Sequence, residues 1–263
     1  MNRSLIINSI PFSPSKLDFS HFLIKEIGSI IKGGKDFLDV GCGRLFFYDL
    51  LLQINAKGNY IGVDLEPRGT INPLSKLSSK VVKTDFLKFS SPKKFDIIAC
   101  LWVLEHIKSD KVVLNRAAHF LKRGGYLILA IPSIWSWPFE FGRHGYHYYS
   151  KNQIVRYIEE VGLKIEYFYE SAGFFGFLFM IVYNWSRFLI LVVSLPIFFI
   201  FSIFGIYRKS WKDFSKSLIS STLYRYHRLK FCIVVHNYIV RALVTIDNLF
   251  KLLPASYVII VKK

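Results

Sequence analysis

Cysteine is scarce in this chain of 263 residues. The three cysteines, Cys42, Cys100 and Cys232, are scattered along the sequence. An odd, scattered set excludes a disulfide framework, and none of the spacings suits a metal site. The scarcity favours a reducing compartment, and a chain of this length can bury a core without disulfides.

We also expect no secretion signal. The first apolar run, near the start, is interrupted by Pro11 and is too short for the apolar region of a signal peptide. No internal repeat or low-complexity tract is evident. We therefore expect the N-terminal domain to stay in the cytoplasm.

Acidic residues are few: 18 Asp and Glu stand against 35 Lys and Arg, a net charge of +17. Such a charge first suggests nucleic acid. However, 52% of the chain is hydrophobic and the basic residues form no dense tract. Residues 172–255 carry ten Lys and Arg against two Asp, beside the most apolar residues in the chain. That pairing indicates an anionic membrane surface and no nucleic acid.

The most informative stretch is Asp36 to Arg44. Phe37, Leu38 and Val40 form a short apolar run typical of a buried parallel strand. Gly41 and Gly43 then allow a sharp turn, and helical spacing resumes from 45 to 54. This strand, glycine turn and helix would place a ligand at the carboxyl end of the first strand. The alternative is a tight turn without a ligand.

The pattern predicts three further strands along the chain. Residues 59–64 form a strand that ends in Asp64, about 20 residues after the glycine turn, where a carboxylate can accept hydrogen bonds from ribose hydroxyls. Residues 81–86 form a third strand that ends in Asp85 and Phe86. Residues 95–100 form a fourth and lead into 101–107.

The chain resembles the class I S-adenosylmethionine-dependent methyltransferases, in particular the small-molecule branch with the ubiquinone-biosynthesis O-methyltransferases. The matching motifs, in order, are LDVGCGR, YIGVDLE, TDF, FDIIACLWVLEHI and LKRGGYLILAIPS. The resemblance implies a Rossmann-like α/β fold: a mostly parallel seven-stranded sheet with an antiparallel last strand. Leu45 departs from the family pattern, which often has a third glycine there, so the methionine end of the pocket would differ in shape.

The resemblance also implies a set of cofactor-binding residues. Gly41 and Gly43 would bring bare backbone to the cofactor, and Asp64 would bind the ribose. Asp85 and Phe86 would meet the adenine. The full set expected around S-adenosyl-L-methionine is Asp39, Gly41, Cys42, Gly43, Asp64, Leu65, Asp85, Phe86, Leu101 and Trp102.

Candidate catalytic residues are His147, His106 and Glu105. Glu105 and His106 match the Glu-His pair of quinone-type O-methyltransferases, but Trp102 stands where those enzymes have a further acid for a divalent metal. We therefore expect no metal. An imidazole can remove a hydroxyl proton near neutral pH, and we prefer His147 over His106. The alternatives are that His147 only positions the next helix and that Glu105-His106 only braces a loop.

Along the rest of the chain, helices and strands alternate. The ranges expected to be helical are 16–31, a weak helix around Leu74, 109–121 with Ser109 or Asp110 as its cap and Gly124-Gly125 as its end, and 151–161; those expected to be strands are 126–131, 163–169 and 256–261. This predicts an N-terminal helical cap (1–35), a catalytic domain (36–171), an insertion (172–255) and the final strand of the catalytic sheet (256–263).

The insertion is expected to associate with a membrane. Residues 188–207 lack charge for about 20 residues, long enough to cross a bilayer. Two crossings would need about 40 residues between 173 and 207, and 35 are present. We therefore expect a re-entrant or in-plane helical hairpin that bends near Arg187, and an interfacial amphipathic helix over 231–246. An unusually apolar core hairpin is the alternative.

Together these patterns predict a membrane-associated methyltransferase, with its catalytic domain on the cytoplasmic side, that acts on a hydroxyl oxygen of a lipophilic or lipid-linked small molecule such as a quinone or glycan precursor. The alternatives are a non-catalytic or cofactor-sensing membrane module with the same fold, and a methyltransferase for a polysaccharide precursor. An NAD-dependent oxidoreductase fits less well, because GCGRLFF lacks the third glycine of G-x-G-x-x-G.

Overall fold

The computed structural model describes residues 13–26, 28–31, 33–73, 75–139, 145–206, 210–211, 213–214, 229–250 and 252–263. These residues divide into two compact units. The sheet unit comprises Asp18–Ser171 and Leu253–Lys263, and the helical unit comprises Met1–Leu17 and Ala172–Leu252.

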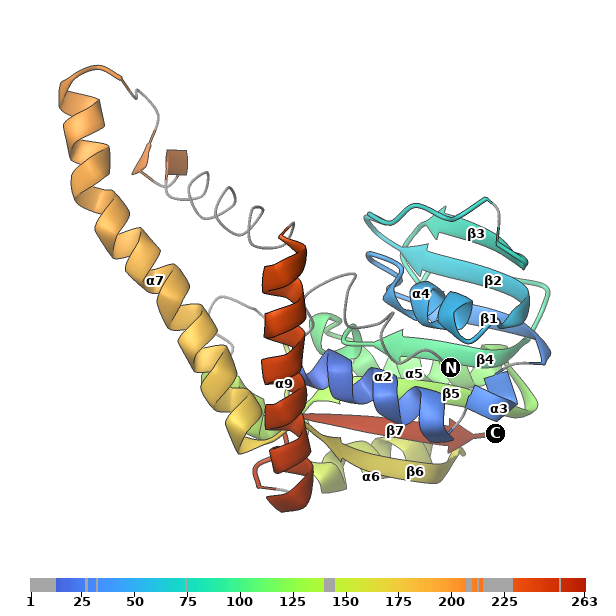
Figure 1. Ribbon diagram of the computed structural model, residues 1–263. Coiled ribbons are helices and arrows are strands. Elements are labelled where there is room, and N and C mark those ends of the chain that lie inside the picture. Colours follow the sequence, from blue (N-terminus) through green and yellow to red (C-terminus); the bar gives the residue numbers. More distant parts are fainter. Residues whose placement is uncertain are drawn as a thin grey trace. The chain divides into compact units, whose positions relative to one another are not determined.

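The sheet unit is built on seven strands: β1 (Gly34–Val40), β2 (Lys57–Asp64), β3 (Leu77–Lys83), β4 (Phe95–Leu101), β5 (Leu121–Pro132), β6 (Lys164–Ser171) and β7 (Ser256–Lys262). Their order across the sheet is β3-β2-β1-β4-β5-β7-β6 (Figure 1). The first five strands pair in parallel, and β7 is antiparallel to both β5 and β6. The predicted mixed sheet with an antiparallel last strand is confirmed.

Helices cover both faces of this sheet. On one face, α5 (Asp110–Phe120) and α6 (Lys151–Glu160) bury Val113, Leu114 and Ile154 among side chains from the strands. On the other face, α2 (Pro14–Glu26), α3 (Gly28–Ile31) and α4 (Phe46–Gln53) form a second core. Central strands are apolar on both faces because both are covered, which explains their nearly unbroken hydrophobic runs.

Several predicted boundaries need correction. The helix expected over 16–31 corresponds to α2 and α3, which are described on either side of residue 27. No helix occurs in the described residues around Leu74, where the chain runs through turns to β3. Helix α5 does not extend to Gly124-Gly125, because β5 begins at Leu121. The Ser109 side chain makes no capping hydrogen bond, and Asp110, which is the first residue of the helix rather than its cap, accepts the N–H of its neighbour Lys111 over 2.7 Å.

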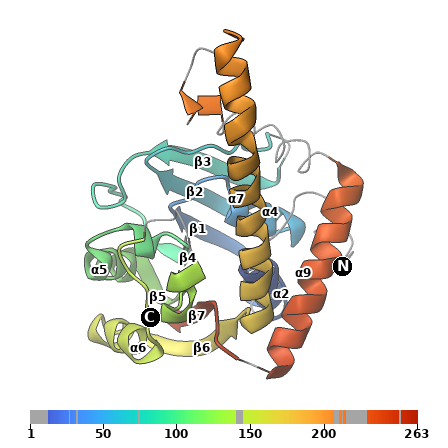
Figure 2. The same ribbon diagram turned by 90° about the vertical axis from the view of Figure 1, so that its left-hand side faces the viewer.

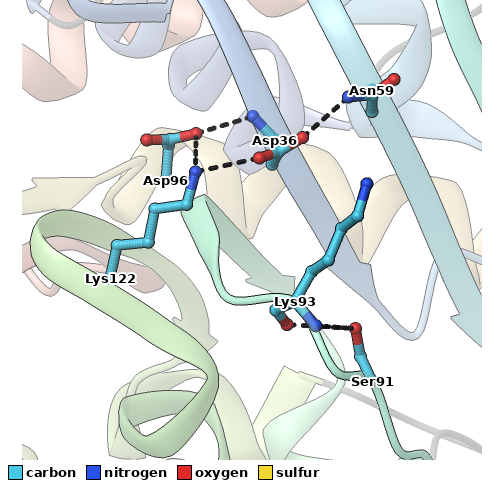
Figure 3. Close-up of polar contacts among 6 residues, drawn as sticks. All are labelled: Asp36, Asn59, Ser91, Lys93, Asp96 and Lys122. Atoms are coloured by element: carbon cyan, nitrogen blue, oxygen red, sulfur yellow. Dashed lines mark hydrogen bonds and ion pairs between the residues drawn. The ribbon is translucent and has the colours of Figure 1, made fainter.

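Charged side chains tie together the amino ends of the parallel strands (Figure 3). Lys122 Nζ on β5 lies 2.9 Å from a carboxylate oxygen of Asp36 on β1 and 2.9 Å from one of Asp96 on β4. Asn59 on β2 donates to Asp36 over 2.8 Å. Hydrogen bonds from Asn59 and then Lys122 lower the pKa of Asp36. This cluster fastens four neighbouring strands at the edge of the sheet away from the glycine turn.

The helical unit contains α7 (Phe174–Ile203) and α9 (Lys230–Phe250). The hairpin expected to bend near Arg187 is wrong, because α7 continues as one helix of 30 residues past Arg187 and Pro196 (Figures 1 and 2). Asn184, Trp185 and Ser186 interrupt the apolar pattern without the glycine that a tight helical turn needs. A proline inside a helix removes one hydrogen bond, and α7 accommodates that loss.

The base of α7 is fixed to α9 by one buried carboxylate. Asp247 accepts backbone N–H groups of Gly173, Phe175 and Gly176, each over 2.8 Å. A Cβ on Gly173 would lie 3.0 Å from Asp247 Oδ1 and 2.6 Å from the carbonyl oxygen of Leu252. A carboxylate at a helix N-terminus satisfies N–H groups that have no partner within the helix. Asp247 thereby joins the start of α7 to the end of α9.

Candidate active site

The glycine turn follows β1 as predicted. Gly41 has φ 70° and Gly43 has φ 46°, a backbone region that side chains rarely adopt. The N–H groups of Gly41 and Cys42 donate to the carbonyl oxygen of Val63, over 2.7 and 3.1 Å. A Cβ on Gly41 would lie 2.2 Å from Val103 Cγ2, whereas one on Gly43 would meet no atom closer than 3.9 Å. Gly41 is thus required by packing, whereas a Cβ on Gly43 would make only ordinary van der Waals contacts.

Asp64 ends β2 beside this turn. Its Oδ2 accepts the N–H of Gly43 over 2.9 Å, and its Oδ1 accepts the N–H of Glu66 over 2.7 Å. These bonds orient the carboxylate while each oxygen retains a further lone pair. Leu65 is 65% exposed. The arrangement brings Gly41, Gly43 and Asp64 together, as expected.

Asp39 and Cys42 are buried beneath the turn. Asp39 accepts a hydrogen bond from the hydroxyl of Tyr60 over 2.7 Å, and burial raises its pKa to about 7. Burial likewise raises the pKa of Cys42 to about 12, so this thiol is unreactive at neutral pH. Both residues support the turn from below, and a contact with the cofactor stays a prediction for each.

Asp85 and Phe86 lie in the turn after β3, because that strand ends at Lys83 and not at Phe86 as predicted. Asp85 Oδ1 accepts the N–H of Leu87 over 2.9 Å. The Phe86 ring is buried and lies 6.5 Å from the ring of Phe89 and 6.2 Å from that of Phe120. Phe86 is therefore a core residue, and its expected contact with adenine stays a prediction.

Leu101 is the last residue of β4 and Trp102 follows it, so this strand is one residue longer than predicted. Trp102 has φ 53°, and its N–H donates to the carbonyl oxygen of Ala130 over 2.7 Å. Its ring packs edge-on against Phe19, with centroids 5.4 Å apart, and lies 6.0 Å from Phe46. An aromatic wall thus stands at the carboxyl end of β4.

Glu105 and His106 lie in the short 3₁₀ helix η1 (Leu104–His106). Glu105 is buried, and its carbonyl oxygen accepts the N–H groups of Tyr146 and His147 over 2.6 and 3.3 Å. The His106 ring is half-exposed, with Nε2 3.9 Å from Glu105 Oε1. The backbone carbonyl of Glu105 therefore fixes, through these two hydrogen bonds, the loop that contains His147.

His147 is held on both sides of its ring. Nε2 lies 3.1 Å from the carbonyl oxygen of Lys108, and Nδ1 lies 3.9 Å from Asp110 Oδ2. Asp110 is buried and also accepts the hydroxyl of Tyr149 over 3.2 Å. His106 thus lies in η1, and His147 is hydrogen-bonded to the backbone of the same short helix. His144, another histidine of this loop, lies outside the described residues.

A family model described as "Methyltransferase domain" matches residues 18–167, more than half of the chain. The chain belongs to this methyltransferase family.

Curated methyltransferases share similarity with the chain, and a solved structure shares its fold. The chain is 26% identical over 183 residues to a ubiquinone biosynthesis O-methyltransferase of Pseudoalteromonas translucida, covering 61% of this chain and 73% of the relative. It is 30% identical over 126 residues to the protein of the same name from Hydrogenovibrio crunogenus, covering 45% of this chain and 48% of that relative. The structure of a SAM-dependent methyltransferase from Archaeoglobus fulgidus matches with a TM-score of 0.51 and 20% identity, covering 95% of each chain.

The methyltransferase family implies S-adenosyl-L-methionine as the cofactor, and the residues present fit it. At Gly43 a ligand would meet backbone that no side chain covers, and the oriented Asp64 carboxylate suits ribose hydroxyls. When bound, the cofactor supplies an electrophilic methyl group on a sulfonium. The chain's own tasks are then to align an acceptor with that methyl and to exclude water.

No group of three or more His, Cys, Asp or Glu side chains that could hold a metal occurs within the described residues. Trp102, at the position where an acid would complete such a group, instead packs its ring in the aromatic wall.

Three residues that support the methyltransferase site were missed by sequence analysis. Val103 blocks any side chain at Gly41, Tyr60 holds Asp39, and Phe19 comes from a helix 83 residues before Trp102 in the sequence. All three are apolar or aromatic residues of the kind that any core contains, so the local pattern gave no signal. Only the strand order could have paired them with the site.

Proposed function

We propose that this methyltransferase transfers a methyl group to a hydroxyl oxygen of a lipophilic or lipid-linked small molecule at a membrane surface, with the catalytic part on the cytoplasmic side. The observation that carries the proposal is the apolar surface of η2 (Ile134–Phe139), the 3₁₀ helix directly after β5. Ile134 is 51% exposed, Trp135 51% and Trp137 68%. Large apolar side chains exposed together commonly mark a binding surface.

Two buried serines hold η2 in the orientation that leaves its large apolar side chains exposed. Ser133 donates its N–H to the carbonyl oxygen of Ala255 over 3.0 Å, and its hydroxyl bonds to the carbonyl of Pro254. Ser136 donates its hydroxyl to the carbonyl oxygen of Ser133 over 2.8 Å. Because side chains three apart eclipse in a 3₁₀ helix, Ile134 and Trp137 share one stripe while Ser136 turns inward. An apolar acceptor would find this surface already formed.

The helical unit supports the membrane part of the proposal. Many large apolar side chains of α7 and its C-terminal end are exposed, namely Leu189, Val192, Val193, Leu195, Ile197, Phe199, Ile200, Phe201, Ile203, Phe204 and Ile206. Within the described part of the chain, α9 is the one helix whose length and composition would allow a membrane crossing, and a third of its apolar window is buried. Six Lys and Arg lie in 207–229 against one Asp, a charge that complements anionic headgroups.

His147 is the first candidate for the base that removes the hydroxyl proton, and His106 is the second. If Nε2 is protonated and donates to the Lys108 carbonyl oxygen, Nδ1 is unprotonated and can accept the hydroxyl proton of the substrate. The Asp110 carboxylate would then face the imidazolium formed by proton transfer. Glu105 would contribute indirectly, by holding the loop that contains the first of these histidines.

The deciding experiment is transfer of a radiolabelled methyl group from S-adenosyl-L-methionine to a lipid extract and, in parallel, to water-soluble glycan precursors. We expect the label in the lipid fraction, and replacing both Trp135 and Trp137 by Ser should raise the KM for the lipid acceptor. Label confined to the water-soluble fraction would instead favour a polysaccharide precursor. Cofactor binding without transfer to either would favour a non-catalytic module.

The histidine assignment is tested by His147→Ala. We expect turnover to fall by about 10²–10⁴ with S-adenosylhomocysteine affinity nearly unchanged. His119→Ala, on the exposed side of α5, is the control and should retain turnover. Full turnover of the His147 variant would remove it from the mechanism and leave His106 as the candidate.

Membrane association is tested with the intact protein. It should sediment with vesicles of phosphatidylcholine and phosphatidylglycerol, and less well as salt is raised. In cells, Trp211→Cys in a background without the native cysteines should react with an impermeant thiol reagent only from the cytoplasmic side. A protein that stays monodisperse without detergent and ignores vesicles would contradict this part of the proposal.

A further inference from the structure

Leu45 has an unusual backbone conformation for its residue type. It follows the glycine turn with φ 63°, in the left-handed region, and immediately precedes α4. A side chain at such a position clashes with its own backbone, so residues other than glycine persist there only when their surroundings compensate. The contacts that stabilise this conformation of Leu45 therefore indicate its role.

The Leu45 side chain packs against the loop after β2, which comprises residues 65–70. Leu45 is buried, at 2% exposure. A Cβ built on Gly69 would lie 2.4 Å from Leu45 Cγ and 2.7 Å from Cδ1. The loop backbone therefore approaches Leu45 as closely as a glycine allows, and any larger residue at 69 would push the two apart.

The same loop is hydrogen-bonded to the glycine turn. The N–H of Arg68 donates to the carbonyl oxygen of Gly43 over 2.9 Å, while the N–H of Gly43 donates to Asp64 Oδ2 over 2.9 Å. The N–H of Glu66 donates to the other oxygen of Asp64. Both polar groups of the Gly43 peptide are thus engaged by the residues that follow β2, and the carboxylate is fixed from both sides.

We propose that Leu45 is a positioning residue for the methyl donor: its contact with Gly69 holds the loop after β2 against the glycine turn, and so sets the distance between the Gly43 backbone and the Asp64 carboxylate. This proposal rests on donor binding and does not depend on the identity of the acceptor. The strained conformation of Leu45 is the cost of placing a bulky side chain where it can reach the loop.

A double-mutant cycle tests the contact, with S-adenosylhomocysteine affinity measured by calorimetry. Gly69→Ala alone should weaken binding by about tenfold or more, because the new methyl group displaces the loop. In a Leu45→Gly background all three of the nearest atoms are gone and φ 63° is unstrained, so the same change at 69 should have about a threefold effect at most. Gly34→Ala is the control, since nothing lies within 4 Å of a Cβ there.

Two further readouts separate positioning from a merely structural role. Adenosine alone should lose affinity in Gly69→Ala by about the same factor as S-adenosylhomocysteine, because the displaced carboxylate meets the ribose. The apparent melting temperature of each variant is measured alongside. Equal losses of affinity from Gly69→Ala in both backgrounds, or a lower melting temperature with unchanged affinity, would overturn the proposal. If Gly69→Ala does not fold, Leu45→Gly decides alone: unchanged affinity would overturn it.

Discussion

The sheet unit and the helical unit treat apolar side chains in opposite ways. The 165 residues of the sheet unit bury theirs on two faces of a sheet, and its charges leave a net +7. The 98 residues of the helical unit expose large aliphatic and aromatic side chains along α7, and carry +10. Hydrophobic sequence therefore led to burial only where another layer covered it. The exposed apolar side chains of α7, beside positive charge, are the basis of our proposal that this unit meets an anionic lipid surface.

The largest expected effect lies in the sheet unit, at the glycine turn. Gly41→Arg should abolish S-adenosylhomocysteine binding in calorimetry, because even a Cβ there would overlap Val103, at 2.2 Å. Gly124→Ala is the matched control: Gly124 has a similar φ of 72° but open space around it, and should bind normally. NADH binding in place of S-adenosylhomocysteine would be incompatible with the assignment.

Asp39 should make the stability of the sheet unit depend on pH. Burial raises its folded pKa to about 7, above its unfolded value near 3.9, so the folded state holds the proton more tightly. The stabilising contribution is complete below about pH 4 and is lost as pH rises to 7, a loss on the order of 3–4 kcal/mol. Asp39→Asn keeps an acceptor for Tyr60 and should remove this dependence in urea unfolding from pH 4 to 8. Parallel pH curves for the two proteins would refute it.

The helical unit should be most sensitive at Asp247. Asp247→Ala leaves three backbone N–H groups without their carboxylate and should cost roughly 2–3 kcal/mol of unfolding free energy. Hydrogen exchange at the start of α7 should rise, and we expect S-adenosylhomocysteine affinity to stay within about twofold. Asp213→Ala, an exposed acid in the same unit, is the control. An equal loss of cofactor affinity would show that the two units are energetically coupled.

The smallest effect is expected at the amino edge of the sheet. Lys122→Ala removes ion pairs to Asp36 and Asp96, but all three side chains are partly exposed, so the loss should be below about 1 kcal/mol. Cofactor affinity should not change, because these residues lie away from the glycine turn. Thermal unfolding at low and high salt checks this, and an effect insensitive to salt would contradict an ionic origin.

The sheet was predictable because its strands carry their own signal. Leu38, Val40 and Ile98 lie in nearly unbroken apolar runs, which are typical of a strand covered on both faces. Asp64 was placed correctly since its position after a strand fixes it at the carboxyl edge. Phe86 was assigned beyond the true end of its strand, because an aromatic residue suits a strand and a core turn equally.

The helical unit and the histidine geometry were less predictable, because they depend on distant partners. Counting residues over 173–207 favoured a hairpin, yet nothing local forces a turn at Arg187 and the helix continues. The contacts of His147 with Lys108 and Asp110 join residues almost 40 positions apart. The sequence likewise gives no sign that Asp247 is more than an ordinary polar residue on a helix, because its three N–H donors lie more than 70 residues earlier.

The register of the last two strands has a consequence for how this chain tolerates its long insertion. Ser171, the last residue of β6, is paired directly with Ser256, the first residue of β7. The 84 residues between them therefore begin and end at neighbouring points, and Asp247 fastens the two ends together just beyond. To the sheet, this insertion is equivalent to the loop of a β-hairpin, and loop-closure entropy grows only slowly with length. The helical unit could thus be lengthened, shortened or exchanged in evolution without changing the strand register that builds the active site.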